Sequence, residues 1–323
     1  MAKSKKISLK ATATHELESS FEEFIRFSKA KNLSSSTIRN YQREFKHFHQ
    51  WYDGDLQDIS GNTVLAYTEH LQDKVTPSGQ DISTASVNTA LRVLRVVLNY
   101  WNEQGYIKPI KVKLQRANET IKDTYTDAEI SKLLKKPDIK KVSFPVYRTW
   151  VIVNFLIGTG CRLGTLVAVR IGDIDFENEL IRYAHTKNKK GQFVPLSRQL
   201  GQVLQEYLRH RGGESDDLLF PSETNTKLLT TSIAHDIAKY NRERGVLKTS
   251  CHLFRHTFVK NWILQGGDPL RLQKVLGHST LAMTQHYSNL YGTDLKHNFE
   301  DFNLLSRLKA DKIKFGKVSG GAK

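Results

Sequence analysis

The sequence predicts a mainly α-helical protein with an all-helical first domain and a mostly helical second domain that contains a small antiparallel β-sheet. Three observations support this prediction. The length of 323 residues suits two domains. Apolar residues recur at spacings of three and four over most of the chain, as they do on one face of a helix. Finally, "ELIRYAHTKNKKGQFVPL", residues 179–196, places two β-rich runs around a polar turn, which predicts a hairpin.

After a basic tail, residues 1–13, we expect residues 14–108 to form a bundle of four amphipathic helices. The second helix is entered through "LSSST", a run of side chains that favour the N-cap position. The apolar stripes of the four helices consist, in chain order, of Leu17, Phe21, Phe24 and Ile25; of Ile38, Tyr41, Phe45, Phe48 and Tyr52; of Val64, Tyr67 and Leu71; and of Val87, Leu91, Leu94, Leu98 and Trp101.

Residues 109–123 carry many charges and no clear period, which predicts a basic linker between the domains. The second domain then spans residues 124–323. Thr126 and Glu129 have the spacing of a capping box, so a helix begins there. A strongly apolar helix over residues 147–160, the hairpin and further helices follow. Near the end, Phe299, Phe302 and Leu305 form the stripe of a C-terminal helix ahead of the tail, which packs either on its own domain or on a neighbouring protomer.

The charge of the chain indicates a polyanionic partner. Lys and Arg number 49 against 33 Asp and Glu, a net charge of +16. Such an excess is typical of proteins that bind nucleic acid, because each neutralised phosphate releases condensed counterions. Binding to a membrane surface usually concentrates basic residues in one segment, whereas here they run the whole length. We therefore expect a nucleic-acid-binding protein.

The sequence also argues against a membrane or secreted protein. It has no run of about 18 apolar residues, and its start lacks the apolar segment of a signal peptide. Two cysteines, Cys161 and Cys251, cannot make a disulfide framework and are too few for a structural zinc site. A reducing compartment, the cytoplasm, fits this composition.

Cationic side chains lie between the apolar stripes of the second and fourth predicted helices and along the linker. Such positions are often no more than solvated helix faces, and that alternative stays open for each of them. With the net charge of the chain, they become candidates for DNA contacts. The candidates are Arg39, Arg43, Lys46, Arg92, Arg95, Lys111 and Lys113.

Four short patterns in the second domain suggest chemistry. "TGCRLGTL" places Arg162 after a glycine bend, and "HLFRHTF" places His252 and Arg255 on one helix face. The hairpin turn contains several lysines, and "LGHSTLAMTQHYSNL" places Tyr287 nine residues after His278. A buried arginine tethered by backbone carbonyls is the structural alternative for Arg162, but burial of a guanidinium without an anion is costly.

A zinc site on the "HLFRHTF" helix is the other alternative, because His252 and His256 are four residues apart. The metalloprotease pattern needs a glutamate directly after the first histidine, where this sequence has Leu253. We therefore predict no metal site.

Together, and in this order, the four patterns resemble the tyrosine recombinases of the phage-integrase family. The resemblance covers residues 125–290 and includes "VPL" after the hairpin lysines. It extends more loosely to "LSSSTIRNYQREFKHFHQW", which is similar to the start of the family's SAM-like core-binding domain. It implies site-specific DNA recombination, by strand cleavage and rejoining through a covalent 3′-phosphotyrosine and a Holliday junction, as in integration or excision of a mobile element or in resolution.

The resemblance assigns a role to each site residue. It makes Tyr287 the nucleophile, and a tyrosine hydroxyl can store the phosphate covalently. It gives the binding of the phosphate to Arg162 and Arg255, whose planar forks each grip two oxygens. It implies neither a metal nor another cofactor.

The same resemblance distributes the proton transfers. Lys187 in the hairpin protonates the leaving 5′ oxygen, with Lys189 as the nearest competitor. His252 assists proton transfer from the tyrosine, and His278 hydrogen-bonds the scissile phosphate. The sequence departs from the family pattern at Thr165, where an acidic residue usually helps to orient the catalytic groups.

The implied partners are double-stranded DNA with inverted-repeat core sites and three further copies of the chain, giving a homo-tetramer on two DNA sites. An accessory directionality factor is left open, and no membrane is involved. The protein would then work in the cytoplasm, associated with the nucleoid. Two other functions stay open: a topoisomerase IB-like relaxase that uses the same tyrosine, and a non-catalytic architectural or regulatory DNA-binding protein on the same fold.

Overall fold

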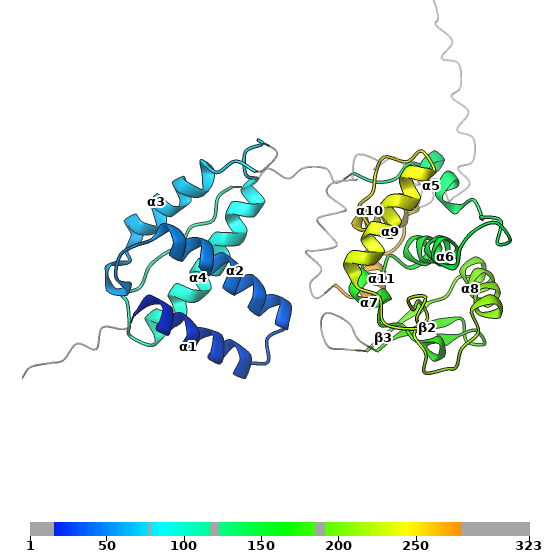
Figure 1. Cartoon of the computed structure of the whole chain (residues 1–323), viewed down its shortest axis with the longest axis horizontal. Coiled ribbons are helices and arrows are strands. Elements are labelled where there is room, and N and C mark those ends of the chain that lie inside the picture. The colour runs from blue at the N-terminus through cyan, green and yellow to red at the C-terminus, as the bar shows by residue number, and fades with distance from the viewer. Residues whose placement is uncertain (1–15, 77–78, 117–122, 185–190, 279–323) are drawn as a thin grey trace, which may run out of the picture. The chain divides into compact units, whose positions relative to one another are not determined.

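The computed structural model describes residues 16–76, 79–116, 123–184 and 191–278. The chain divides into two compact units, residues 1–120 and 121–323. In the described part the first unit has helices and no sheet, and the second has helices and one small sheet (Figure 1). The predicted fold class, mainly α with a small antiparallel sheet in the second domain, is confirmed.

Four helices form the first unit, and their bounds are α1 Leu17–Ala30, α2 Ser35–Trp51, α3 Gly61–Gln72 and α4 Thr84–Glu103. A 3-10 turn, Leu56–Asp58, connects α2 to α3. The last helix, α4, packs against each of the other three, and its Trp101 is fully buried. The predicted apolar stripes form this core, with Tyr41 and Tyr52 half-buried at its rim.

Serine side chains fix where three of these helices begin. The side chains of Ser34, Ser60 and Ser83 each accept a hydrogen bond from the backbone N–H three residues later. Such caps satisfy backbone donors that the first turn of a helix leaves open. The run "LSSST" therefore acts as predicted, through Ser34.

The first part of the predicted linker is an extended segment packed on the first unit. Val112 is buried in its core, and the side-chain amide of Asn88 exchanges hydrogen bonds of 2.9 and 2.8 Å with the backbone of Gln115. Alternate side chains of an extended segment point to opposite sides. Lys111 and Lys113 are accordingly exposed, on the side opposite Val112.

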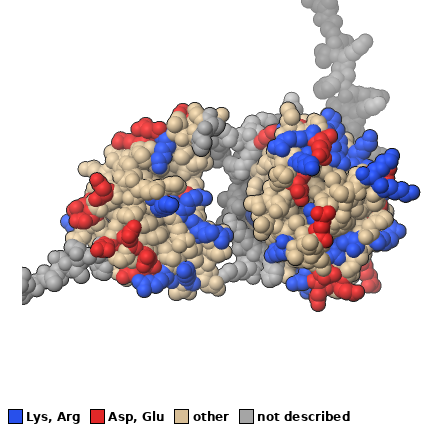
Figure 2. All heavy atoms as spheres, in the orientation of Figure 1, with Lys and Arg blue, Asp and Glu red and all other residues tan. Residues whose placement is uncertain are grey.

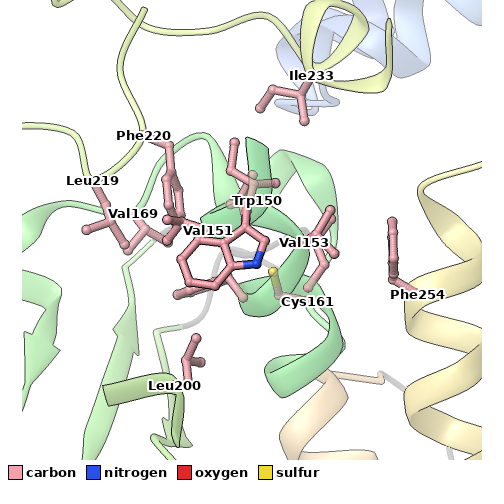
Figure 3. Close-up of a cluster of buried hydrophobic side chains, with 14 of the residues drawn as sticks. Trp150, Val151, Val153, Cys161, Val169, Leu200, Leu219, Phe220, Ile233 and Phe254 are labelled. Atoms are coloured by element: carbon pink, nitrogen blue, oxygen red, sulfur yellow. The ribbon is translucent and has the colours of Figure 1, made fainter. Parts of the chain in front are cut away.

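In the second unit, the apolar helix α6 (Phe144–Thr159) is central and contacts α5, α8, α9 and α10. Figure 3 shows side chains from several of these elements gathered around Trp150 and Val151 of α6. The other helices of the unit are α5 Asp127–Leu134, α7 Leu163–Leu166, α8 Arg198–Arg211, α9 Thr230–Glu243, α10 His252–Leu264 and α11 Pro269–Leu276. The capping box predicted at Thr126 and Glu129 opens α5, with bonds of 3.2 and 2.8 Å.

The sheet is antiparallel with the order β1 (Ile174–Asp175), β2 (Leu180–Tyr183) and β3 (Gln192–Pro195). The two longer strands form the predicted hairpin, in which Tyr183 pairs with Gln192. The short strand β1 has only two residues and was not predicted, because two residues show no periodicity. Among the residues that the structure describes, no helix is long and apolar enough to cross a membrane.

Candidate active site

The first arginine follows a left-handed bend at the end of α6. The helix stops at Gly160, which has a φ of 61°, and Arg162 then occupies the N-cap position of α7. A side chain at residue 160 would also place its Cβ 2.7 Å from the ring of Phe258. Glycine is therefore needed both for the backbone angle and for the close approach of α10.

The second arginine reaches the same bend from α10. Arg255 is only 7% exposed. Its Nη1 donates to the carbonyl oxygen of Gly160 at 2.9 Å, and its Nη2 donates to that of Leu276 at 3.1 Å. Arg255 thus joins the end of α6 to the end of α11.

Both guanidinium groups donate hydrogen bonds to the C-terminal end of α11. Arg162 Nη1 donates to the carbonyl oxygen of Leu276 at 3.3 Å, the same oxygen that Arg255 contacts. The last carbonyls of a helix carry partial negative charge, so this end stabilises nearby cations. The helix itself ends at Gly277, with a φ of 61°.

His278 follows this turn and contacts Arg255. Its Nε2 lies 2.7 Å from Arg255 Nη2, and it must accept the hydrogen bond because arginine only donates. Burial, with the positive charges of Arg255 and Arg162, lowers the pKa of His278 to about 4. The imidazole is therefore neutral at pH 7.

Both arginines are tethered by backbone carbonyls, the arrangement named above as the structural alternative for Arg162. The tether does not exclude an anion site, because a guanidinium has five N–H donors. It fixes the position of two positive charges beside a neutral histidine. Such fixed donors can stabilise charge that develops on a phosphate without rearranging during the reaction.

The remaining predicted site residues differ in where they lie. His252 is exposed at the first position of α10, three residues before Arg255. Thr165 is half-buried in α7, and its backbone N–H donates to the carbonyl of Arg162 at 2.9 Å. Lys187 and Tyr287 lie outside the described residues, so their roles stay predictions.

The two cysteines of the second unit are not suited to act as nucleophiles. Burial raises the pKa of the Cys161 and Cys251 thiols to about 11, so both stay protonated at neutral pH. In the described part of the chain, no three His, Cys, Asp or Glu residues are grouped so as to hold a metal ion.

One polar contact at the site was not predicted. The side chain of Gln192 at the start of β3 donates from Nε2 to the carbonyl oxygens of Lys274 at 2.6 Å and Val275 at 2.7 Å. The only local signal was a polar residue on the same strand face as the buried Val194. Its partners lie more than 80 residues away.

On the first unit, the candidate DNA contacts are exposed: Arg39, Arg43 and Lys46 on α2, and Arg92 and Arg95 on α4. The two helices pack against each other, and Arg43 of α2 and Thr89 of α4 line one pocket between them. Figure 2 shows the Lys and Arg atoms of this unit mainly on one side, with most Asp and Glu atoms on another. We therefore expect these cations to act on one partner.

Comparison with known proteins agrees with this arrangement. The model of the phage integrase family matches residues 123–293, and that of the phage integrase SAM-like domain matches residues 14–119. Tyrosine recombinase XerA of Pyrococcus furiosus is 27% identical over 79% of this chain and 92% of its own length. Tyrosine recombinase XerD of Pseudomonas aeruginosa is 26% identical over 80% of this chain and 88% of its own length.

Solved structures share the fold. The Tn1549 transposon integrase in complex with transposon right end DNA has a TM-score of 0.70 at 19% identity, over 86% of this chain and 97% of its own. A lambda integrase tetramer bound to a Holliday junction has a TM-score of 0.67 at 17% identity, over 85% of this chain and 78% of its own.

Proposed function

Since this chain belongs to the phage integrase family and is a site-specific tyrosine recombinase, we propose that Tyr287 is its nucleophile. We further propose that Arg162, Arg255 and His278 bind the scissile phosphate. One observation carries the proposal: two arginines from different helices and the histidine meet at the end of α11. Nine residues separate His278 from Tyr287 in the sequence.

In the cleavage step, the hydroxyl oxygen of Tyr287 attacks the phosphorus and the bond to the 5′ oxygen breaks. The proton of the tyrosine passes to His252, and Lys187 supplies a proton to the leaving 5′ oxygen. The product is a 3′-phosphotyrosine and a free 5′ hydroxyl. Attack by the 5′ hydroxyl of another strand reverses these steps, so the energy of the phosphodiester is retained and no metal or nucleotide is consumed.

The two arginines stabilise the charge of the pentacoordinate phosphate, and each donor of this kind typically contributes about 3–4 kcal/mol. His278 begins as a neutral imidazole that accepts a hydrogen bond from Arg255. A bound phosphate raises the pKa of this imidazole, because an anion offsets the two arginines that lower it. His278 can then donate a hydrogen bond to a phosphate oxygen.

The first unit would hold the DNA through the exposed cations of α2 and α4, and through Lys111 and Lys113 of the extended segment. Exposed Lys and Arg side chains suit phosphate contacts, which position a protein on the duplex without reading its sequence. The second unit then presents the arginines and His278 to one phosphate.

The proposed assembly is a homo-tetramer that brings two DNA sites together, each with inverted-repeat core sequences. It is supported by the fold shared with a lambda integrase that forms a tetramer on a Holliday junction. An accessory directionality factor would choose between integration and excision. The reaction takes place on the nucleoid in the cytoplasm.

A covalent trapping assay tests this function. The full-length protein and Tyr287→Phe are incubated with EDTA and a nicked duplex from the border of the DNA segment that encodes the chain. We expect a protease-sensitive adduct that survives denaturation with the wild type alone, because the phenylalanine lacks the nucleophilic oxygen. DNA binding is measured for both proteins and should be equal.

Three results would contradict the proposal. An adduct with Tyr287→Phe would assign the nucleophile to another residue. Specific binding by both proteins without any adduct would favour the non-catalytic DNA-binding alternative. Cleavage without a tetramer on two sites would point to a relaxase instead.

A further inference from the structure

Gln192 connects the β2–β3 hairpin to the last turn of α11. It shares the inward strand face with Val194, which is 1% exposed, whereas Phe193 between them is 65% exposed. Both hydrogen bonds of its side chain go to consecutive backbone carbonyls, those of Lys274 and Val275. The side-chain NH₂ must face α11, because a carbonyl oxygen in its place would meet two acceptors.

Three consecutive backbone carbonyls of α11 therefore accept the hydrogen bonds of Gln192 and of the two arginines. The first two accept from Gln192, and the third, that of Leu276, accepts from Arg162 and Arg255. The two arginines and the hairpin are in this way attached to the same helical turn. His278, two residues further on, belongs to that turn as well, since its backbone N–H donates to the carbonyl of Gln273.

Gly277 allows the side chain of Gln192 to approach the turn closely. With a φ of 61°, it already has a backbone angle that favours glycine. A Cβ built on it would also lie 2.6 Å from Oε1 of Gln192. The amide thus lies directly against the backbone of the turn, with no room for a side chain between them.

Lys187 precedes Gln192 by five residues in the sequence, between the paired strands β2 and β3. We propose that Gln192 is a positioning residue: it holds the hairpin in register with the turn of α11, so that Lys187 reaches the 5′ oxygen of the phosphate held by Arg162 and Arg255. This inference rests on the proposed function, since it assigns Lys187 the protonation of the leaving group.

The chemistry of the leaving group separates this role from a general effect on stability. An alkoxide leaves slowly unless it is protonated, whereas a thiolate leaves readily without a proton. DNA with a 5′-bridging sulfur at the cleaved bond therefore needs no acid. A variant with a misplaced Lys187 should be slow on the oxygen substrate and normal on the sulfur substrate.

The experiment compares Gln192→Met with the wild type in single-turnover cleavage of both duplexes. Methionine has nearly the length of glutamine but lacks its amide, so it cannot donate to the two carbonyls. On the oxygen duplex we expect a rate about tenfold to a hundredfold lower than that of the wild type, and on the sulfur duplex a rate within about threefold of it. Gln202→Met, the same change at an exposed position of α8, is the matched control and should match the wild type on both.

A double-mutant cycle provides a second measurement. In a Lys187→Ala background, Gln192→Met should slow cleavage of the oxygen substrate no further, because residues that act through one another are not additive. An equal loss on both substrates, a full additional loss in the Lys187→Ala background, or an unchanged rate would overturn the proposal. Failure of the proposed function looks different, since the wild type would then form no adduct on either duplex.

Discussion

The cations of the first unit and those of the second are held in opposite ways. Arg39, Lys46 and Arg92 lie exposed on the helices α2 and α4. Arg162 and Arg255 are instead fixed by the backbone carbonyls at the ends of α6 and α11. We therefore expect two uses of positive charge, one for DNA affinity and one for the geometry of the active site.

Each use has a physical reason. An exposed cation contributes by releasing counterions, and its contribution is largely independent of its neighbours and falls with salt. A tethered arginine has lost its conformational freedom during folding, so the reaction needs no further reorganisation. We therefore expect changes in the first unit to alter DNA affinity, and changes at the end of α11 to alter rates.

The largest effect should come from Arg255→Lys. A lysine keeps the charge but cannot contact Gly160, Leu276 and His278 at once, because it lacks the planar fork. We expect cleavage to slow by about 10²–10³-fold, the value of one transition-state donor, with little change in DNA affinity. Rates are measured by adduct formation at saturating DNA.

The control is Arg209→Lys, the same change at an exposed position on α8. It should leave the cleavage rate of the wild type unchanged. A large loss of affinity with an unchanged rate in Arg255→Lys would remove the distinction between the two kinds of cation.

The next largest effect concerns the pH dependence of stability. The unfolded chain protonates His278 near pH 6.5, whereas the folded protein does so only near its lowered pKa of about 4. Between these values the unfolded state binds more protons, so the free energy of unfolding falls as the pH falls. The loss that this histidine causes should reach about 2–3 kcal/mol at pH 4.

His278→Gln lacks this titration. Chemical denaturation of both proteins at pH 7 and pH 4.5 measures the difference, and carboxylates that titrate in both proteins cancel. We expect the wild type to lose more stability than the variant. An equal loss would mean that the arginines do not hold the imidazole neutral.

Gly277→Ala should have a smaller effect on stability. The left-handed angle costs an alanine about 1–2 kcal/mol, and contact with Gln192 adds to this cost. Gly245 is a matched control, because its φ of 68° is similar and nothing lies within 4 Å of a Cβ built on it. Thermal unfolding should therefore show a larger loss for Gly277→Ala than for Gly245→Ala. Equal losses would leave only the backbone angle as the cause.

The smallest effect per residue should come from the exposed cations. The double variant Arg39→Ala and Arg43→Ala should lower the slope of log affinity against log salt by up to about 1.8, at about 0.9 for each phosphate contact. Arg26→Ala with Lys29→Ala on α1 removes the same charge and serves as the control. Equal changes in both slopes would indicate general charge attraction instead of a defined face.

Much of this architecture could be predicted because its signals are local. Ser34 and Thr126 start helices through neighbours three residues away, and both act as the sequence indicated. The glycine bend before Arg162 is also local, and the structure has it at Gly160. The resemblance to recombinases then grouped Arg162 with Arg255 and His278, and the structure brings these three together, although their roles stay predictions.

The contact of Gln192 could not be predicted, since its partners in α11 are far along the chain and are backbone atoms. Backbone carbonyls have no sequence signature, because every residue has one. The packing of Val112 on the first unit is similar. Charge and a missing period indicated a linker, and the alternation of Ile110, Val112 and Leu114 was too short to stand out.

The bond between Arg162 and Leu276 joins residues 114 positions apart, and the bond between Arg255 and Gly160 spans 95. The core of the first unit lies within residues 17–114, ahead of every residue in these two bonds. Because a chain is made from its N-terminus and its domains fold as units, the first unit can be complete while the ribosome is still adding α10 and α11. A nascent chain could thus hold DNA before its phosphate-binding arginines have come together, and the capacity to cut arises late in synthesis.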